Sequence, residues 1–276
     1  MNRAFVYMFS HLMEGKQMTY QYLISETRGP VGWIILNRPE LLNALCTDLA
    51  EEAISALTDH LENDDVRVVV LTGEGKAFTA GADVLEVVND PNPSKRIKIL
   101  ATIAHRAITE IRQSPKPVIA AINRQAAGYG AALSLACDIR VATERVRLRY
   151  AYSTIGLTGD GGINFTLPKM IGLSRAMEVA LLADDLTEDD LARAGLVTRF
   201  FPEETFREET QKVAEQVARL PVSVSGAIKR MMYGSFGTDF LVHLSTELSH
   251  VVDAASQPEF IEMLSSLLAA FQAKTT

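Results

Sequence analysis

Cysteine is scarce in this sequence of 276 residues, with only Cys46 and Cys137, far apart and in no CxxC motif. Two isolated thiols argue against a disulfide framework and are typical of a reducing compartment. Basic residues are also few: 27 Lys and Arg stand against 34 Asp and Glu, so the net charge is −7. Without a basic stripe, nucleic acid is not expected as the main partner.

Long hydrophobic runs are absent as well. The longest uncharged apolar stretch, Gln125–Cys137, is rich in glycine and shorter than the roughly 20 residues that span a bilayer. The mildly apolar segment Phe5–Leu12 is followed by Glu14 and Lys16 with no small-residue cleavage site, unlike a signal peptide. Met18 could be the natural start, so residues 1–18 are treated as an N-terminal extension. We expect a cytoplasmic protein that does not enter a membrane.

Several common chemistries lack their motifs. The five histidines show no paired-ligand spacing, so no metal is expected, and there is no GxSxG elbow. Gly75-Lys76 is followed by Ala77, which excludes a phosphate-binding P-loop. The glycines of Gly128-Tyr129-Gly130 lack the third glycine of a dinucleotide fingerprint.

The hydrophobic content of 47% is enough for a large core, and the periodicity predicts an α/β fold. A Gly29-Pro30 turn is expected to join two strands in a hairpin. Buried strands then alternate with helices, which implies parallel pairing. The sequence from Leu173 onward is mostly helical. The strands are expected at Tyr20–Ser25, Val31–Leu36, Val68–Leu71, Pro117–Ile122 and Ile139–Ala142, and helices at Thr47–Leu61 (Thr47 as N-cap), Ser94–Arg112, Gly128–Leu135, Glu203–Arg219, Ser223–Tyr233, Phe240–Val252 and Glu259–Lys274.

Two turns rich in small residues follow successive buried strands. One is Thr72–Asp83 and the other is Ala126–Ala132. Small side chains let a ligand approach the backbone, and free amides at a helix start favour negative charge. Each turn by itself can be a plain strand-to-helix connection. Together, two amides converging on one oxygen would form an oxyanion hole, worth about 3–4 kcal/mol per donor.

These turns also carry a resemblance. Asn37-Arg38-Pro39, Asn43-Ala44-Leu45, Gly75–Asp83, Lys116–Asn123 with Ala126–Ala132, and Cys137–Arg140 closely resemble the crotonase (enoyl-CoA hydratase/isomerase) superfamily. The likeness covers about residues 20–274. It implies a spiral of ββα units at 19–200, a helical trimerisation region at 201–276, trimers or paired trimers, and acyl-CoA substrates. Coenzyme A is then part of the substrate, and no separate cofactor is expected.

The resemblance implies roles for individual positions. The oxyanion donors would be the backbone amides of Ala82 and Tyr129. The coenzyme would lie along Asn43-Ala44-Leu45 and Ala80–Asp83, with Gly128 and Tyr152 also at the binding site.

The acid/base positions decide the reaction. The glutamates of the family's hydratases fall here on Ala132 and Tyr152, which cannot transfer protons as carboxylates do. Asp160 matches the stretch in which the family's isomerases keep a catalytic Asp, so it is predicted as the base for double-bond isomerisation. Packing against Tyr152, Leu157 and Phe165 would desolvate it. The structural alternative is that Asp160 caps a helix beginning at Gly161 or Gly162.

A second reaction is open. Ala151–Asp160 and Leu173–Glu178 also look like the 4-chlorobenzoyl-CoA dehalogenase branch, in which an Asp attacks the aryl ring and a His activates water. His105 lies in the region that supplies this histidine, although a lone helix histidine is more often a surface or core residue. A hydratase with non-standard acid/base residues is a third reading. A non-catalytic CoA-binding or structural oligomer is a fourth.

Minor positions have two readings each. Glu86 could face the pocket or solvent, and Lys229 and Lys274 could meet CoA phosphates or lie on a plain helix surface.

Overall fold

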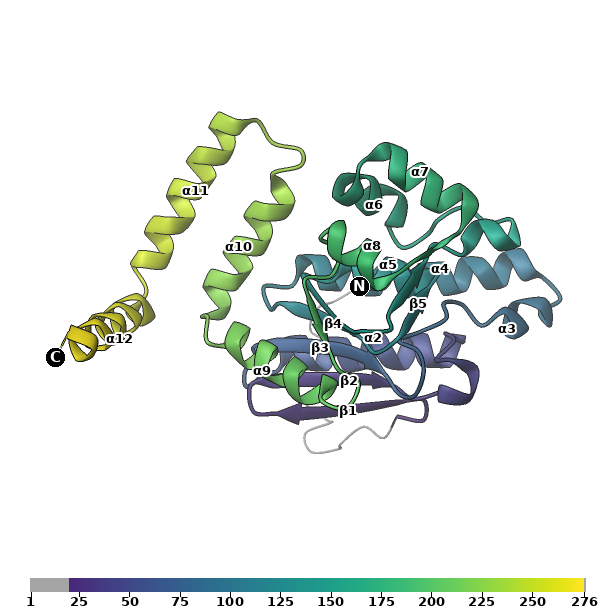
Figure 1. The fold of residues 1–276 in the computed structure, drawn as a ribbon, viewed down its shortest axis with the longest axis horizontal. Helices are drawn as coiled ribbons and strands as arrows, with labels where there is room; N and C mark the ends of the chain where they lie inside the picture. Colours follow the sequence, from purple (N-terminus) through teal and green to yellow (C-terminus); the bar gives the residue numbers. More distant parts are fainter. Residues whose placement is uncertain (1–19, 276) are drawn as a thin grey trace, which may run out of the picture.

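The computed structural model describes residues 20–275, and the predicted extension at 1–18 lies outside this range (Figure 1). A six-stranded sheet forms the centre in the order β1-β2-β3-β4-β6-β9. Only β1 and β2 pair antiparallel, as the predicted hairpin, and the other neighbours are parallel. Its strands are β1 (Leu23–Arg28), β2 (Val31–Leu36), β3 (Val68–Gly73), β4 (Val118–Ile122), β6 (Ile139–Thr143) and β9 (Arg199–Phe201).

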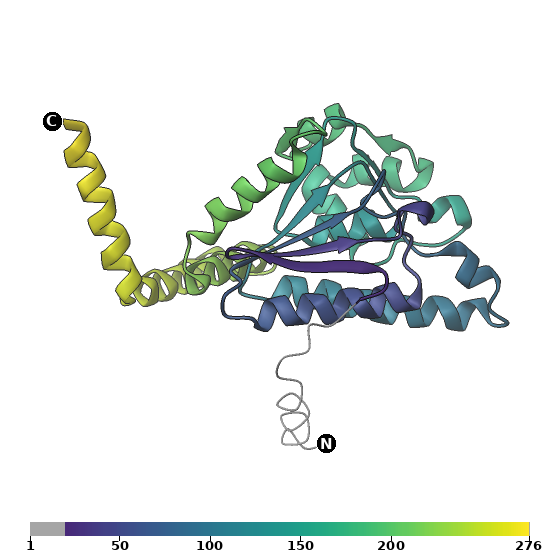
Figure 2. The same cartoon turned by 90° about the horizontal axis from the view of Figure 1, so that it is seen from below.

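Helices cover both faces of this sheet. Side chains alternate across β2, so Ile34 and Trp33 point into different core clusters. The Ile34 side packs on α2 (Thr47–Glu62) and continues toward α4 (Pro93–Gln113) and α5 (Tyr129–Ala136). The Trp33 side packs on α9 (Phe206–Ala218), where the indole nitrogen donates to Gln211 Oε1 at 2.7 Å. Figure 2 shows α2 and α4 together below the sheet.

A second layer of short pairings lies beside the sheet and carries the small-residue turns. It contains β5 (Gln125–Ala127), β7 (Arg147–Arg149) and β8 (Asp185–Leu186). Isolated parallel bridges join Leu45 to Ala82 and Thr79 to Ala126. Each ββα step of the chain therefore places one strand in the large sheet and one short segment in this layer. The segments of successive steps lie side by side.

The remaining helices follow the sheet or connect its late strands. They are α3 (Val84–Val88), α6 (Ile163–Ile171), α7 (Leu173–Leu182), α8 (Glu188–Arg193), α10 (Val222–Gly234), α11 (Phe240–Ala255) and α12 (Pro258–Thr275), with short 3-10 turns at Pro39–Leu41 and Tyr152–Ile155.

The predicted α/β plan with a helical C-terminal region is confirmed, with local corrections. The strands β8 and β9 lie in the part predicted as helical. They are two and three residues long, too short to show a periodicity of their own. Thr47 is the first residue of α2 rather than its cap, which is Cys46.

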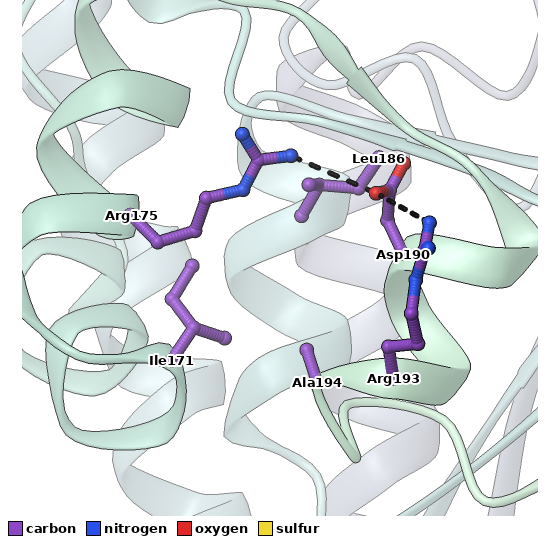
Figure 3. Close-up of a pocket in the computed structure, with 6 residues that line it drawn as sticks. All are labelled: Ile171, Arg175, Leu186, Asp190, Arg193 and Ala194. Carbon is purple, nitrogen blue, oxygen red and sulfur yellow. Dashed lines mark hydrogen bonds and ion pairs between the residues drawn. The ribbon is translucent and has the colours of Figure 1, made fainter.

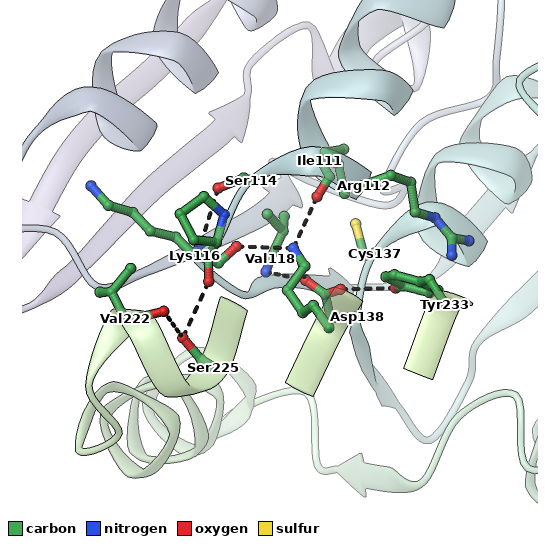
Figure 4. Close-up of polar contacts among 12 residues, drawn as sticks. Ile111, Arg112, Ser114, Lys116, Val118, Cys137, Asp138, Val222, Ser225 and Tyr233 are labelled. Atoms are coloured by element: carbon green, nitrogen blue, oxygen red, sulfur yellow. Dashed lines mark hydrogen bonds and ion pairs between the residues drawn. The ribbon is translucent and has the colours of Figure 1, made fainter. Parts of the chain in front are cut away.

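Helix α10 is fixed to the body by a buried polar cluster (Figure 4). Lys229 Nζ lies 2.8 Å from Asp138 Oδ2 and donates to the carbonyl oxygens of Ile111 and Lys116. Asp138 also accepts from the Val118 amide and the Tyr233 hydroxyl. The expectation that Lys229 is a surface or phosphate-binding residue is wrong, because its side chain is only 6% exposed.

Helices α11 and α12 extend away from the body in both views (Figures 1 and 2). Their apolar side chains face solvent over several turns, and α11 has no buried residue. The exposed set includes Phe240, Leu241, Val242, Leu244, Leu248, Val251, Val252, Phe260, Ile261, Met263, Leu264 and Leu268. Within residues 20–275, no helix combines the length and apolarity needed to cross a bilayer.

Candidate active site

The two small-residue turns meet through their glycines. Ala127 N donates to Thr79 O at 3.0 Å, which holds the turn after β3 against β5. At Gly81, where φ is +96°, a Cβ would lie 2.9 Å from Ala127 O and 3.2 Å from Tyr129 N. Only glycine fits this contact, so the Gly81-Ala82 peptide and the start of α5 lie side by side.

The two predicted donors both have an amide that the local structure leaves available. The bridge to Leu45 uses Gly81 O and the Asp83 amide, so the amide of Ala82 points to the opposite side of this extended segment. Tyr129 is the first residue of α5, where backbone N–H groups have no partner inside the helix. The structure thus brings Ala82 and Tyr129 to one corner.

A polar cluster supports the Ala82 turn from behind. Asp83 caps α3 by accepting from the amides of Leu85 and Glu86. Its carboxylate also pairs with Arg38 at 3.1 Å, and the two side chains are 10% and 11% exposed. Arg38 in turn donates to Ala44 O at 2.6 Å. Glu86 takes neither of its two predicted roles, since it accepts from the Thr47 amide and pairs with Arg96.

His105 and Asp160 meet at the same site. His105 projects from α4, Asp160 from the loop before α6, and His105 Nε2 contacts Asp160 Oδ1 directly. Their side chains are 60% and 31% exposed, so the pair is accessible from solvent. A carboxylate in contact with an imidazole provides a nucleophile or base together with a second proton acceptor.

The loop that carries Asp160 rests directly on α5. At Gly161, where φ is +61°, a Cβ would lie 2.9 Å from the Cβ of Ala132 and 3.2 Å from the ring of Tyr129. The Tyr152 hydroxyl donates to Asp160 O at 3.3 Å. Burial raises the pKa of both tyrosines well above the usual value, so both hydroxyls stay protonated and act as donors.

Asp160 does not cap a helix. Helix α6 begins at Ile163 after Gly162, and no side chain caps it. Of the neighbours predicted to desolvate Asp160, Leu157 and Phe165 are themselves 40% and 65% exposed, and the Asp160 side chain remains 31% exposed. Tyr152 is the predicted neighbour that does lie beside Asp160.

The positions expected along the coenzyme differ in what they can offer a ligand. Asn43 is fully buried, and its side chain donates to Ala77 O and Glu74 O and accepts from the Arg38 amide. Leu45 and Gly128 are buried, whereas Ala44 and Ala80 are partly exposed. A ligand at this edge would therefore meet mainly backbone and small side chains.

Two residues that fix the Asp160 loop were missed in the sequence. The Tyr150 hydroxyl bonds to Asn164 Oδ1 at 2.8 Å, and Asn164 Nδ2 donates to Gly159 O at 3.2 Å. Tyr150 also packs edge-on against Tyr152, with ring centroids 5.2 Å apart. Two tyrosines at alternate positions just ahead of a glycine-rich loop were the only sequence signal for this arrangement.

Two surface hollows lie away from this pair. One, of about 250 Å³, lies among α6, α7 and α8, where Arg175 and Arg193 both approach Asp190 (Figure 3). A larger cleft of about 920 Å³ is lined by charged side chains that include Arg124 and Arg147. Neither is lined by His105, Asp160 or Tyr129. No cluster of three or more His, Cys, Asp or Glu suited to a metal occurs in the described part of the chain.

The stepped ββα layers and the corner formed by Ala82 and Tyr129 define a crotonase-type α/β protein. The family model for enoyl-CoA hydratase/isomerase matches residues 26–260, and the chain belongs to this family. The resemblance and the fold class expected from the sequence are thereby confirmed. The family implies an acyl-CoA substrate.

Individual relatives differ in reaction. The chain is 33% identical to 4-chlorobenzoyl coenzyme A dehalogenase-2 of an Arthrobacter species, over 85% of this chain and 86% of that protein. It is 37% identical to a mitochondrial enoyl-CoA hydratase of Pongo abelii, over 79% of this chain and 74% of that protein. The crystal structure of an enoyl-CoA hydratase from Bacillus anthracis superposes with a TM-score of 0.86 at 29% sequence identity. The match covers 91% of this chain and 97% of that one.

Proposed function

We propose that this chain replaces a leaving group on an aryl-CoA thioester by hydroxide, with Asp160 as nucleophile and His105 as general base. The observation that carries the proposal is the contact of His105 Nε2 with Asp160 Oδ1 beside the Ala82 and Tyr129 turns. The dehalogenase relatives, 33% identical to this chain, support the same reading. The sequence alone favoured isomerisation, because it did not place His105 against Asp160.

The first step is attack on the ring. The Asp160 carboxylate bonds to the ring carbon that bears the leaving group, and the electron pair passes through the ring to the thioester oxygen. The amides of Ala82 and Tyr129 stabilise that oxygen, by about 3–4 kcal/mol for each donor. The electrons then return, the bond to the leaving group breaks with its electron pair, and an aryl ester of Asp160 remains.

The second step is hydrolysis of this ester. His105 takes a proton from water while the water oxygen attacks the carboxyl carbon of Asp160. The bond from that carbon to the aryl oxygen breaks, which releases the hydroxyaryl thioester and restores the carboxylate. Over both steps one water is consumed. Its oxygen stays in the Asp160 carboxylate, a former carboxylate oxygen leaves in the product hydroxyl, and its two protons go to that hydroxyl and to the released acid.

Double-bond isomerisation with Asp160 as the base is the second candidate. A single carboxylate can remove a proton at one carbon and return it at another, and the same two amides would hold the enolate. Ala132 and Tyr152 stand where the family's hydratases carry glutamates, so Asp160 is the carboxylate available to either reaction. His105 has no necessary role in isomerisation.

The C-terminal helices support a further part of the proposal, a trimer or a pair of trimers. Helix α11 has no buried residue, and its apolar side chains would be covered by a second copy of the chain.

A panel of thioesters tests the function. Incubation with 4-halobenzoyl-CoA, a 3-enoyl-CoA and a 2-enoyl-CoA, followed by chromatography and mass spectrometry, separates the reactions. Exchange of halide for hydroxyl supports the proposal. Bond migration without a change in mass supports isomerisation instead, and no turnover or binding of any thioester removes both.

A further inference from the structure

The side chain of Tyr129 touches both flanks of the His105–Asp160 pair, apart from any use of its backbone amide. Its hydroxyl donates to the carbonyl oxygen of Ala104 at 3.2 Å, and Ala104 directly precedes His105 on α4. Its ring lies under Gly161, which directly follows Asp160. One buried residue, 9% exposed, therefore contacts the chain next to each member of the pair.

These two contacts differ in kind. The ring contact limits how closely the Asp160 loop approaches α5, because Gly161 has no room for even a Cβ. The hydroxyl contact acts on α4 at the residue before His105, whose side chain is 60% exposed. Few other contacts restrain the imidazole, so the position of its helical turn decides whether Nε2 reaches Oδ1.

We infer that the Tyr129 side chain is a positioning residue that sets the distance between His105 and Asp160. This inference rests on the proposed function and adds a role for the Tyr129 hydroxyl in the step that needs His105. Burial keeps this hydroxyl protonated, which agrees with a permanent donor. For the attack of Asp160 on the aryl ring of the substrate, the part of Tyr129 that is needed is its backbone amide. Losing the hydroxyl should therefore slow ester hydrolysis and spare ester formation.

The test uses Tyr129→Phe, which keeps the amide and the ring and removes one oxygen atom. With 4-chlorobenzoyl-CoA, we expect kcat to fall about ten-fold, roughly the free energy of one neutral hydrogen bond. KM should fall with kcat and kcat/KM should be kept, because ester formation is spared while the ester accumulates. Rapid quenching and peptide mass spectrometry should then show the aryl ester on Asp160 accumulating, as it should in His105→Gln. Tyr233→Phe is the matched control. It also removes one tyrosine hydroxyl, but this hydroxyl belongs to α10 and donates to Asp138 at 2.8 Å, outside the His105–Asp160 site.

The outcomes separate this inference from the proposed function. Ester accumulation in His105→Gln but not in Tyr129→Phe overturns the positioning role and leaves the proposed function intact. No ester in any variant overturns the proposed function. A substrate-free measurement then decides the positioning role: the imidazole nitrogen NMR signal of His105 should shift in Tyr129→Phe in the same direction as in Asp160→Asn. An unmoved signal, or an equal shift in Tyr233→Phe, contradicts it.

Discussion

The Nε2 atom of His105 lies in direct contact with the Oδ1 atom of Asp160, although 55 residues separate them in the chain. One side chain comes from α4 and the other from the loop before α6. Both stay partly exposed, as groups that meet a substrate must be. This contact gives the site a second proton acceptor next to its carboxylate.

Replacing Asp160 with asparagine should abolish turnover and leave thioester binding intact. The amide keeps the shape of the side chain and removes its charge and basicity. We expect kcat to fall by about a hundred-fold or more. Isothermal titration with a CoA thioester measures the binding. Near-normal turnover in Asp160→Asn would contradict the role assigned to the carboxylate.

Replacing His105 with glutamine separates the two candidate reactions. Hydrolysis of an aryl ester on Asp160 should slow about a hundred-fold or more, because the base for water is lost. Isomerisation should proceed at its usual rate. The measurement is steady-state turnover of 4-halobenzoyl-CoA and of a 3-enoyl-CoA by the variant and the unaltered enzyme. Unchanged rates with both substrates would exclude a role for His105.

Replacing Lys229 with methionine should destabilise the fold by about 3–5 kcal/mol, because Asp138 is left as a buried charge without its partner. Urea denaturation followed by circular dichroism measures the change. Lys212→Met is the control: Lys212 pairs with Glu208 and Glu209 on the exposed surface of α9, and no measurable change is expected. Equal effects in both variants would mean that the buried cluster does not fix α10.

Cys137 should resist alkylation in the native protein. Burial raises the pKa of its thiol to about 12, and the thiolate is the reactive form. Iodoacetamide at pH 8 should label the half-buried Cys46 and leave Cys137 unmodified until denaturant is added. Peptide mass spectrometry reads out the two sites. Labelling of Cys137 at the rate of Cys46 would show that its surroundings open readily.

An acidic substitution on α11 should break the proposed trimer. Leu248 is 65% exposed in the single chain, and Leu248→Asp would place a charge in the interface proposed between copies. Sedimentation velocity should show a shift from trimer or hexamer toward monomer. Ile24→Asp, on the β1 edge at 40% exposure, is the control and should assemble normally. A monomeric unaltered protein would refute the proposed trimer.

Much of the fold could be predicted because its elements carry strong local patterns. The apolar run at Val68–Leu71 predicted the core of β3, and the helical spacing after Thr47 predicted α2 to within a residue at each end. Strands β8 and β9 could not be found this way. They exist because neighbouring strands supply their hydrogen bonds, and they have two and three residues.

Only part of the candidate active site could be predicted from the sequence. Glycines after two buried strands indicated two turns able to hold an oxyanion, and the family resemblance assigned the donors to Ala82 and Tyr129. The partners of Asp160 depend on how α4 and the 156–162 loop pack on α5, which no local pattern encodes. The same holds for Lys229, whose partners Ile111, Lys116 and Asp138 are far away in the chain.

A single turnover in ¹⁸O-labelled water, with enzyme in excess over 4-chlorobenzoyl-CoA, tests the central claim most directly. If Asp160 attacks the ring, the new hydroxyl oxygen comes from its carboxylate. The first-turnover product then carries ¹⁶O, and ¹⁸O enters the peptide that contains Asp160. Product labelled with ¹⁸O in the first turnover and an unlabelled Asp160 would show direct attack by water and contradict the account.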